Sequence, residues 1–345
     1  MKILPILIAS VIIFSACKPE ERMIEAPQTS WQILAATDMP AALKIIEQPG
    51  SKVITDDAYA AANGEAMPAV TKIAEYGGRL FLLKKDAPEI EVLDRATFKK
   101  SVTIEMSSAG TPIDITFPNA TTAFVIHANT EIVDVVDIYN NKVARSIAVG
   151  KKPVAVAAVG NQVYIANQDD NTLSVIDTRT NLVTMTLPVH TAPMALAAHP
   201  SQNEVLVLSL GGGKLLKEGE EKSPARLTFI NNDTKQTINS VSVFEVAKDS
   251  LLGVPVGLAL GQGSYPYAFV AFKTVITRVD ARRHAGTRIL RQPASAGIQY
   301  NFKRDELLIF NTNGNSLQLI TANPVSGDKR MTTTLPFSPT VIIPF

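Results

Sequence analysis

The chain has 345 residues, with 33 Lys and Arg side chains against 32 Asp and Glu, and 46% of its residues are hydrophobic. The near-neutral charge argues against a strongly basic nucleic-acid-binding surface, and a single cysteine excludes internal disulfides and cysteine-rich metal or iron–sulfur clusters. Because the length exceeds the ~100–200 residues of one typical domain, internal repeats must be sought before domains are assigned.

The N-terminus has the pattern of an export signal. Lys2 gives a positive start, and residues 3–16 are apolar apart from Pro5, Ser10 and Ser15. This stretch is shorter than the ~20 residues that span a bilayer, so residues 1–16 are predicted to be a cleaved signal peptide. Residues 14–17, Phe-Ser-Ala-Cys, resemble the lipobox of bacterial lipoproteins, which implies lipidation at Cys17. The alternative is an incidental cysteine in an apolar run.

Residues 17–30 are predicted to be a tether between the lipid and the folded domain. The absence of Asp directly after Cys17 resembles outer-membrane sorting. Lys18 followed by Glu20 and Glu21 resembles the surface-export signal of some Gram-negative lipoproteins, although a solvated tether explains the same residues. We expect a protein anchored by lipid in the outer membrane, on either its cell-surface or its periplasmic face.

The rest of the chain, residues 31–345, repeats one pattern. A proline precedes a small apolar run, a strand of β-branched and aromatic residues follows, and a third strand ends in Asp; residues 153–178 are the clearest copy. Prolines 68, 112, 153, 193, 255, 293 and 339 are separated by 44, 41, 40, 62, 38 and 46 residues. Most intervals match the ~40–45 residues of a propeller blade, and alternation of period two dominates.

Six full repeats and a C-terminal fragment at residues 340–345 lead to a seventh blade. The fragment can supply one strand, and residues 32–35, 42–46 and 52–55 can supply three. Closure of the ring in this way leaves no exposed terminal sheet edge. We therefore predict an all-β, seven-bladed β-propeller, a single domain closed by pairing of the N-terminal strands with the C-terminal strand.

The copy around residue 164 resembles the Tyr-Val-Thr-Asn (YVTN) repeat of surface-layer-type propellers. The matching residues are Tyr164-Ile165-Ala166-Asn167 and Asn171 to Thr178. Residues 53–64, Val-Ile-Thr-Asp-Asp-Ala-Tyr-Ala-Ala-Ala-Asn-Gly, also resemble the opening of cell-surface propeller lipoproteins, including those that capture corrinoids beside a TonB-dependent transporter. The first resemblance implies the fold, and the second implies a corrinoid (vitamin B12) ligand and a TonB-dependent transporter as partner.

In a propeller whose chain runs from the inside outward, the starts of the first strands and the second-to-third-strand loops share one face. Recognition residues gather on such loops. The predicted ligand-binding residues are Asn129, Lys151, Lys152, Asn167, His190, Ser209, Lys273 and Asn311. Turn-forming asparagines and solvated lysines are the alternative interpretation of these residues.

The histidines and aspartates of the repeats are candidates for metal ligands or for residues that cap turns. His127 and His190 fall toward the ligand face, but no third ligand accompanies them, so no metal site is predicted. His199 and His284 fall in turns on the opposite face and on the outer side of the ring, so both are expected at the surface. Aspartates at the ends of third strands are predicted to cap turns; these are Asp94, Asp137, Asp177 and Asp280.

The 62-residue interval carries an insertion. The interval is about 20 residues longer than its neighbours, and the surplus is predicted at residues 210–224, which include three consecutive glycines and Leu215-Leu216. Loops longer than ~12–15 residues are usually functional lids or disordered. Two structures are compatible with the sequence. One is a flap over the central funnel, the place where the loops of the ligand face converge, and the other is an insertion exposed to solvent.

No motif of an enzyme was found, and we predict a monomeric, non-enzymatic binding protein. The first hypothesis is ligand capture at the funnel, with a corrinoid as the ligand and no other cofactor. The second is a propeller lactonase or related hydrolase that holds a divalent cation with Glu131, Asp169 and Asp170. The third is a scaffold for protein contacts at the cell surface.

Overall fold

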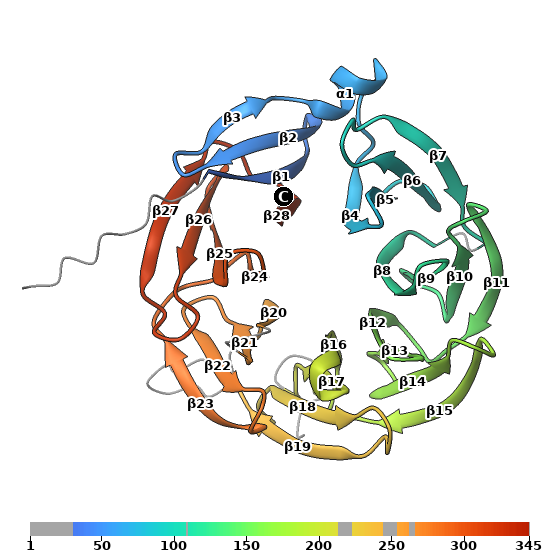
Figure 1. Cartoon of the computed structure of the whole chain (residues 1–345). Coiled ribbons are helices and arrows are strands. Elements are labelled where there is room, and N and C mark those ends of the chain that lie inside the picture. The colour runs from blue at the N-terminus through green and yellow to red at the C-terminus, as the bar shows by residue number, and fades with distance from the viewer. Residues whose placement is uncertain (1–29, 108–109, 213–222, 244–253, 262–265, 345) are drawn as a thin grey trace, which may run out of the picture.

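The computed structural model describes residues 30–344 except for 108–109, 213–222, 244–253 and 262–265. The predicted signal peptide, Cys17 and nearly all of the tether lie outside the described residues. Within the described part of the chain, seven four-stranded antiparallel sheets form a closed ring (Figure 1). The region along the ring axis, which the first strand of each sheet faces, is called the channel below. The prediction of an all-β, seven-bladed propeller is confirmed. No helix in this part is both long and apolar enough to cross a membrane.

The strands of each blade run from the channel outward in chain order. In the first three complete blades they are β4 (Val70–Tyr76), β5 (Arg79–Lys84), β6 (Glu89–Asp94) and β7 (Lys100–Glu105); β8 (Pro112–Asn119), β9 (Thr122–His127), β10 (Ile132–Asp137) and β11 (Lys142–Ala148); and β12 (Pro153–Val159), β13 (Gln162–Asn167), β14 (Thr172–Asp177) and β15 (Leu182–Pro188).

The next three blades follow the same order. Their strands are β16 (Pro193–His199), β17 (Glu204–Ser209), β18 (Arg226–Asn231) and β19 (Thr237–Ser242); β20 (Gly257–Leu260), β21 (Tyr267–Ala271), β22 (Ile276–Asp280) and β23 (Ala285–Leu290); and β24 (Gly297–Asn301), β25 (Glu306–Asn313), β26 (Ser316–Ala322) and β27 (Lys329–Leu335). A 3₁₀ turn, η1 (Pro200–Gln202), precedes β17.

The closing blade combines the two ends of the chain. From the channel outward it contains β28 (Val341–Pro344), β1 (Trp31–Asp38), β2 (Ala41–Gln48) and β3 (Lys52–Thr55). Ile33 lies opposite Pro344 and Ala36 opposite Val341, and Thr340 N donates to Ala36 O at 2.8 Å. The predicted closure is therefore confirmed, with the strands at the predicted positions.

The core lies between neighbouring blades rather than within one. Alternate residues of each strand face the two adjacent sheets, as expected for period-two alternation. Tyr164 and Val175, for example, pack against Val205 and Ile230 of the following blade, and all four are buried. The outermost strands face solvent, and β15 is exposed over most of its length. The ring is thus held together mainly by apolar contacts between sheets.

Four innermost strands begin with a bulge. The register shifts after the first residue of β4, β8, β12 and β16, so that Thr71, Ile113, Val154 and Met194 have no direct partner on the second strand. A bulge bends the strand and redirects a side chain. Thr71 uses this freedom to reach the next blade, where its Oγ1 donates to Pro112 O at 2.6 Å.

The predicted capping aspartates are confirmed. Asp94 accepts hydrogen bonds from Thr97 N at 2.8 Å, and Asp137 accepts from Asn140 N at 2.9 Å. Asp177 and Asp280 bond the next turns in the same way. These bonds to the charged form hold the pKa of Asp137 below its ordinary value. The aspartates therefore shape turns and form no common site.

Helix α1 (Ala58–Asn63) joins the closing blade to the next one. Asp57 caps its first turn by accepting from Ala60 N, and Gly64 ends it with φ 72°. The Asn63 side chain donates to Phe98 O at 3.0 Å and accepts from Lys100 N at 2.8 Å. The segment that resembles corrinoid-capturing lipoproteins thus forms β3 and this helix, where it packs two blades together.

The ring has two distinct faces. The mouth face carries the second-to-third-strand turns at residues 39–40, 85–88, 128–131, 168–171, 210–225, 272–275 and 314–315, and the starts of the innermost strands. The opposite face carries the first-to-second-strand turns and the third-to-fourth-strand turns. The predicted grouping of loops on one face follows from this topology.

The long interval between Pro193 and Pro255 is divided between two connections. Residues 210–225 join β17 to β18, and residues 243–256 join β19 to β20, whereas four residues, 168–171, join β13 to β14. The whole surplus was predicted in the first connection. Residues 213–222 and 244–253 lie outside the described part, so the predicted flap is not tested.

Candidate functional site

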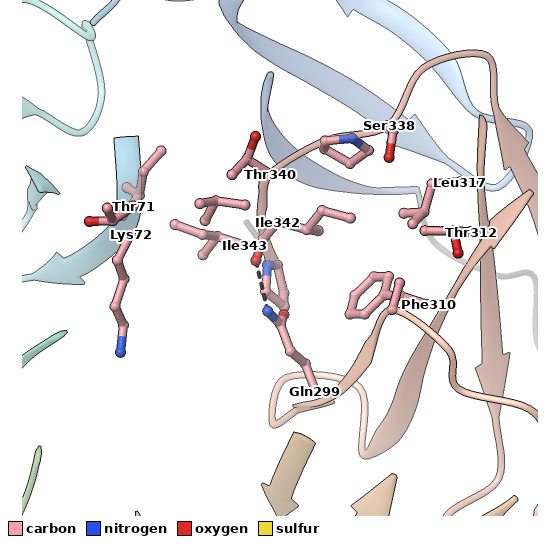
Figure 2. A pocket seen from close by; sticks show the side chains of 15 residues that line it. Thr71, Lys72, Gln299, Phe310, Thr312, Leu317, Ser338, Thr340, Ile342 and Ile343 are labelled. Carbon is pink, nitrogen blue, oxygen red and sulfur yellow. Dashed lines mark hydrogen bonds between the residues drawn. The ribbon is translucent and has the colours of Figure 1, made fainter. Parts of the chain in front are cut away.

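A cavity of about 410 Å³ opens into the channel where the ring closes (Figure 2). It lies among β4, β24 and β25, and the segment from Ser338 to Pro344 forms one of its walls. Its side chains are mostly aliphatic and hydroxylic, with one aromatic ring and one amine. The lining residues used below are Thr71, Lys72, Gln299, Phe310, Thr312, Ser338 and Thr340.

Strand β28 gives the cavity its shape because its alternate residues face different neighbours. Ile343 packs with the core of the β4 blade, and Ile342 packs with Phe310 and Leu317 of the β24 blade. Figure 2 shows Ile343 on the side of Thr71 and Ile342 on the side of Phe310. The final strand thus contributes an apolar wall that exists only in the closed ring.

Polar groups beside the cavity are held by specific partners. Gln299 Nε2 donates to Ile342 O at 2.8 Å. The ammonium of Lys72 forms an ion pair with Asp114 on the next innermost strand. Asp114 Oδ2 also accepts from Val156 N at 3.1 Å, so one carboxylate joins three blades. The charge of Lys72 is therefore largely compensated.

A second cavity of about 600 Å³ lies beside the first on the mouth face. It is lined by the β1–β2 turn, the β25–β26 turn and residues 336–338, and Ser338 and Thr340 line both cavities. Met39 stands at its rim with 94% of its surface exposed. The segment 336–340 therefore separates an inner and an outer cavity at the same point of the ring.

The two cavities together suit a ligand with an apolar body and hydrogen-bonding groups at its edge. Ligand sites are typically concave, ~300–1,000 Å³, and mostly apolar with a few placed polar groups. Phe310, Ile342 and Ile343 supply the apolar surface of the inner cavity, and the hydroxyl groups of Ser338 and Thr340 lie at the boundary with the outer one.

Four of the predicted ligand-binding residues are exposed on the mouth face. They are Asn129, Lys151, Lys152 and Lys273. Lys152 Nζ is 3.5 Å from Asp169 Oδ1, and the backbone N of Lys151 donates to Asp170 Oδ2 at 2.6 Å. Asn129 has φ 60°, a backbone conformation that asparagine tolerates in turns. These residues are accessible, but they lie apart from both cavities.

Three more of the predicted ligand-binding residues, Asn167, Ser209 and Asn311, are buried inside blades. Asn167 donates to Thr172 Oγ1 at 3.1 Å and to Ser174 Oγ at 3.0 Å. Asn311 accepts from Ser295 N at 2.9 Å and donates to Pro293 O at 2.9 Å. Ser209 is fully buried. The hydrogen bonds of Asn167 join β13 to β14 and those of Asn311 hold the connection before β24, whereas Ser209 Oγ has no hydrogen-bond partner among the described residues.

Asn129, Asn167 and Asn311 were predicted to occupy equivalent ends of second strands, and the strand register corrects this prediction for Asn129. Pro112 lies opposite His127, just as Pro153 lies opposite Asn167. His127, and not Asn129, is therefore the equivalent of Asn167. Repeat alignment failed here because the turn after β9 differs in sequence from the turn after β13.

His127 belongs to a buried polar cluster. Its Nδ1 is 3.2 Å from Gly110 O, and its Nε2 is 3.2 Å from Asp134 Oδ2, with both side chains fully buried. Ser146 Oγ donates to Asp134 Oδ1 at 2.7 Å, and Ser107 N donates to Oδ2 at 3.0 Å. Burial raises the pKa of Asp134, but these hydrogen bonds outweigh it and hold the pKa below its usual value.

His190 lies next to the long connection between β17 and β18. Its Nε2 is 3.2 Å from Pro224 O, and its side chain is half-buried. Burial lowers the pKa of His190, the bond to Pro224 opposes this, and the nearby Arg226 adds to it. His190 thus secures the end of the connection that the sequence analysis proposed as a flap.

The expectation of two surface histidines was wrong for His199. His199 is on the opposite face as predicted, but only 1% of its surface is exposed. Ser201 Oγ lies 3.1 Å from its Nδ1. His284 is partly covered, because it packs against Glu204 and Phe229 of the preceding blade. Contacts between blades, which a repeat pattern does not show, therefore cover part of the His284 side chain.

The carboxylates proposed for a hydrolase come from two blades. Asp169 is near Lys152, and Asp170 is bonded to the Lys151 backbone, while Glu131 precedes β10 in the neighbouring blade. Among residues 30–344, with the gaps given above, no three His, Cys, Asp or Glu side chains are grouped so that they could hold a metal ion.

None of the eight predicted residues lines either cavity. The predicted site was built from loops and strand ends, whereas the cavity is formed by Thr71, Gln299 and Phe310 on strands and by the C-terminal segment. The one available signal was the C-terminal fragment itself. A lone strand that must enter the channel to close the ring necessarily brings the residues before it, Ser338 to Thr340, to the mouth.

Comparison with known proteins supports the fold. No family model matches the chain, and no curated protein matches it in sequence. Among solved structures, hydrazine synthase of Kuenenia stuttgartiensis is similar over 85% of this chain and 89% of its own, with 14% identity and a TM-score of 0.61. A "putative 6-phosphogluconolactonase" from Bacteroides uniformis is similar over 92% and 100%, with 10% identity and a TM-score of 0.69. At these identities the similarity shows a shared propeller architecture.

Proposed function

We propose that this protein is a lipid-anchored propeller that binds a ligand at the ring closure and releases it unchanged. The observation that carries the proposal is the pair of adjoining cavities of about 410 and 600 Å³ around residues 336–340. They combine an apolar wall with hydroxyl groups where the two ends of the chain meet. Such a preformed site is typical of ligand binding.

A corrinoid is the proposed ligand. The corrin ring offers a large apolar surface edged by amides, which matches an apolar inner wall flanked by Ser338 and Thr340. A corrinoid is larger than the inner cavity, so it would cover both cavities and the segment between them. The short resemblance of residues 53–64 to corrinoid-capturing lipoproteins supports the same ligand class.

Capture beside a transporter explains why an anchor would be useful. Tethering two proteins to one membrane raises their effective concentration to as much as ~mM, so handover to a TonB-dependent transporter needs no large permanent interface. The mouth of the propeller then needs only to be accessible for the ligand to enter and leave.

The test is a titration of the purified protein with cobalamin, followed by absorbance and by calorimetry. We expect saturable binding at micromolar concentrations. Ser338→Trp places a bulky ring between the two cavities and should abolish binding. The matched control is Thr332→Trp on the exposed outer strand β27, which should bind normally. Absence of heat and of a spectral change in the wild-type protein would reject the proposal.

The hydrolase and scaffold alternatives are distinguished by the same preparation. A lactonase should bind calcium or another divalent cation and hydrolyse a sugar lactone, with loss of activity after Asp169→Asn or Asp170→Asn. A scaffold should bind neither cobalamin nor lactone. The similarity to the solved structures above does not choose among these activities.

A further inference from the structure

The first strand enters the ring from the opposite face. Strand β1 runs from Trp31 to Asp38, and its Asp38 end turns into β2 on the mouth face, beside the outer cavity. Trp31 is at the other end, where the guanidinium carbon of Arg304 lies 5.7 Å from its ring centroid. Arg304 is in the β24–β25 turn of the opposite face. The described part of the chain therefore begins on that face, at Ser30.

The length of the tether favours one orientation. Thirteen residues separate Cys17 from Trp31, and they span at most ~45 Å when fully extended. For the mouth face to lie on the membrane, the tether would have to run back along the eight-residue β1, which uses about 26 Å of that length. With the opposite face on the membrane, the tether would not have to run back along β1, so its full length would be available between the lipid and the domain.

The exposed charges of the two faces differ. The exposed basic side chains at the turns of the opposite face and the adjoining strand ends are Lys52, Lys99, Lys100, Lys142, Arg179, Arg282, Arg283, Lys303, Lys329 and Arg330. The exposed acidic side chains described there are Glu75, Asp94, Asp233 and Asp328, together with Glu65, whose Oε1 lies 3.7 Å from Lys100 Nζ. The corresponding exposed charges described on the mouth face are Lys85, Lys151, Lys152, Lys273 and Arg291 against Asp86, Glu105, Glu131, Asp169 and Asp170.

Two exposed aromatic side chains accompany the basic residues of the opposite face. Phe302 is 60% exposed and Tyr139 is 81% exposed. Phe302 and Lys303 are in the same turn as Arg304, so they lie beside the point where the tether leaves. Basic side chains are attracted to anionic lipid headgroups, and aromatic rings are favoured at the level of the headgroups.

We propose that the opposite face of the propeller rests on an anionic lipid leaflet and that the mouth face points away from the membrane. This proposal rests on the lipid anchor at Cys17. The basic turns contact phosphate groups of the lipids, Phe302 inserts among the headgroups near the tether, and the two cavities remain open to the surrounding solution.

The test uses the full-length lipidated protein in vesicles that contain phosphatidylglycerol and a lipid with a nitroxide on its headgroup. Because Cys17 is the only cysteine and its thiol is consumed by lipidation, a second cysteine can be labelled alone. A fluorophore at Lys303→Cys should be quenched several-fold more strongly than one at Lys273→Cys on the mouth face. Equal quenching, or stronger quenching at position 273, would overturn the orientation.

Charge reversal tests the role of the lipid headgroups. In the Lys303→Cys background, Arg283→Glu with Lys329→Glu should lower quenching at position 303 on phosphatidylglycerol vesicles. Lys151→Glu with Lys152→Glu, the same change of charge on the mouth face, should leave it unchanged. If both pairs act alike, the basic face has no specific contact with the lipid.

Separate readouts distinguish failure of the anchor from failure of the orientation. The mass of the mature N-terminus reports whether Cys17 carries lipid, and a free Cys17 would overturn both ideas. Lipidated Cys17 with equal quenching at the two positions would overturn the orientation alone. Cobalamin titration of the same sample tests ligand binding independently of both.

Discussion

Glu204 at the start of β17 and His284 in the β22–β23 turn link two adjacent blades. His284 Nε2 lies 2.8 and 2.9 Å from the two carboxylate oxygens of Glu204, although the residues are 80 positions apart. Burial raises the pKa of Glu204, and His284 opposes this rise. Tyr164 O–H donates to Asn232 in the next blade in the same manner, at 2.7 Å. Such links add specific polar contacts to the apolar packing between blades.

Loss of the imidazole should weaken this link. His284→Asn preserves a residue that tolerates the φ of 54° but leaves the Glu204 carboxylate without its partner. We expect a loss of about 1–3 kcal/mol in the free energy of unfolding, measured by urea denaturation. Asn239→Ala removes the bond to His284 O and the bond that Asn239 Oδ1 accepts from Ser240 N, but it leaves the pair of Glu204 and His284 in place and should cost less. An unchanged unfolding midpoint for His284→Asn would show that the pair contributes nothing.

Asp134 should make the free energy of unfolding depend on pH. Its pKa is held below the usual value, and a carboxyl of this kind stabilises the fold above its unfolded pKa of ~3.9 and loses that effect as the pH falls through its folded pKa. Asp134→Asn should therefore lower stability by about 1–3 kcal/mol at pH 7. Urea denaturation of both proteins at neutral and acid pH should show the difference narrowing below pH ~4. The exposed Asp86→Asn is the control, and a constant difference would contradict the prediction.

Gly150 should not tolerate a side chain. A Cβ at this position would lie 2.7 Å from Asn167 Cγ and 2.7 Å from Asp170 Oδ2, and Asn167 is fully buried. Gly150→Ala should cost about 1–3 kcal/mol of stability by overpacking. At Gly257 the nearest atom would be 3.6 Å away, so Gly257→Ala should be neutral or slightly stabilising. Thermal unfolding of the two variants compares them directly.

Removal of the last strand should open the ring. A chain that ends at Pro339 loses β28, exposes the edge of β1 and removes the buried Ile342 from the core. We expect loss of a single cooperative thermal transition and a tendency to aggregate through the free edge. A chain that ends at Pro344 keeps all of β28 and should unfold like the full-length protein. A truncated chain that still unfolds cooperatively would contradict the role of closure.

Local patterns were sufficient to predict the architecture. Alternation of period two, prolines at regular spacing and aspartates at turns are properties of short segments, and each acts on the backbone within a few residues. The strands around Tyr164, the caps at Asp137 and Asp177 and the strand at residues 341–344 were therefore predicted in place. The number of blades follows from counting these segments.

The positions of side chains relative to other blades could not be predicted in this way. His127 was expected to face the mouth but is buried against Asp134, and His199 was expected at the surface but is covered by neighbouring elements. Register shifts at the start of four inner strands also change which residues face the channel. A shift of one residue reverses the direction of a side chain, and the sequence does not mark it.

The sequence by itself thus determined a closed ring of seven sheets, because strand alternation and turn chemistry are local and a lone C-terminal strand must find a partner at the other end of the chain. Only the tertiary structure decided where a ligand fits. The cavities arise where Thr71, Gln299, Phe310 and Ser338, from separate parts of the chain, meet across the closing strand. Their assembly depends on packing between blades, which becomes defined only when the ring is closed.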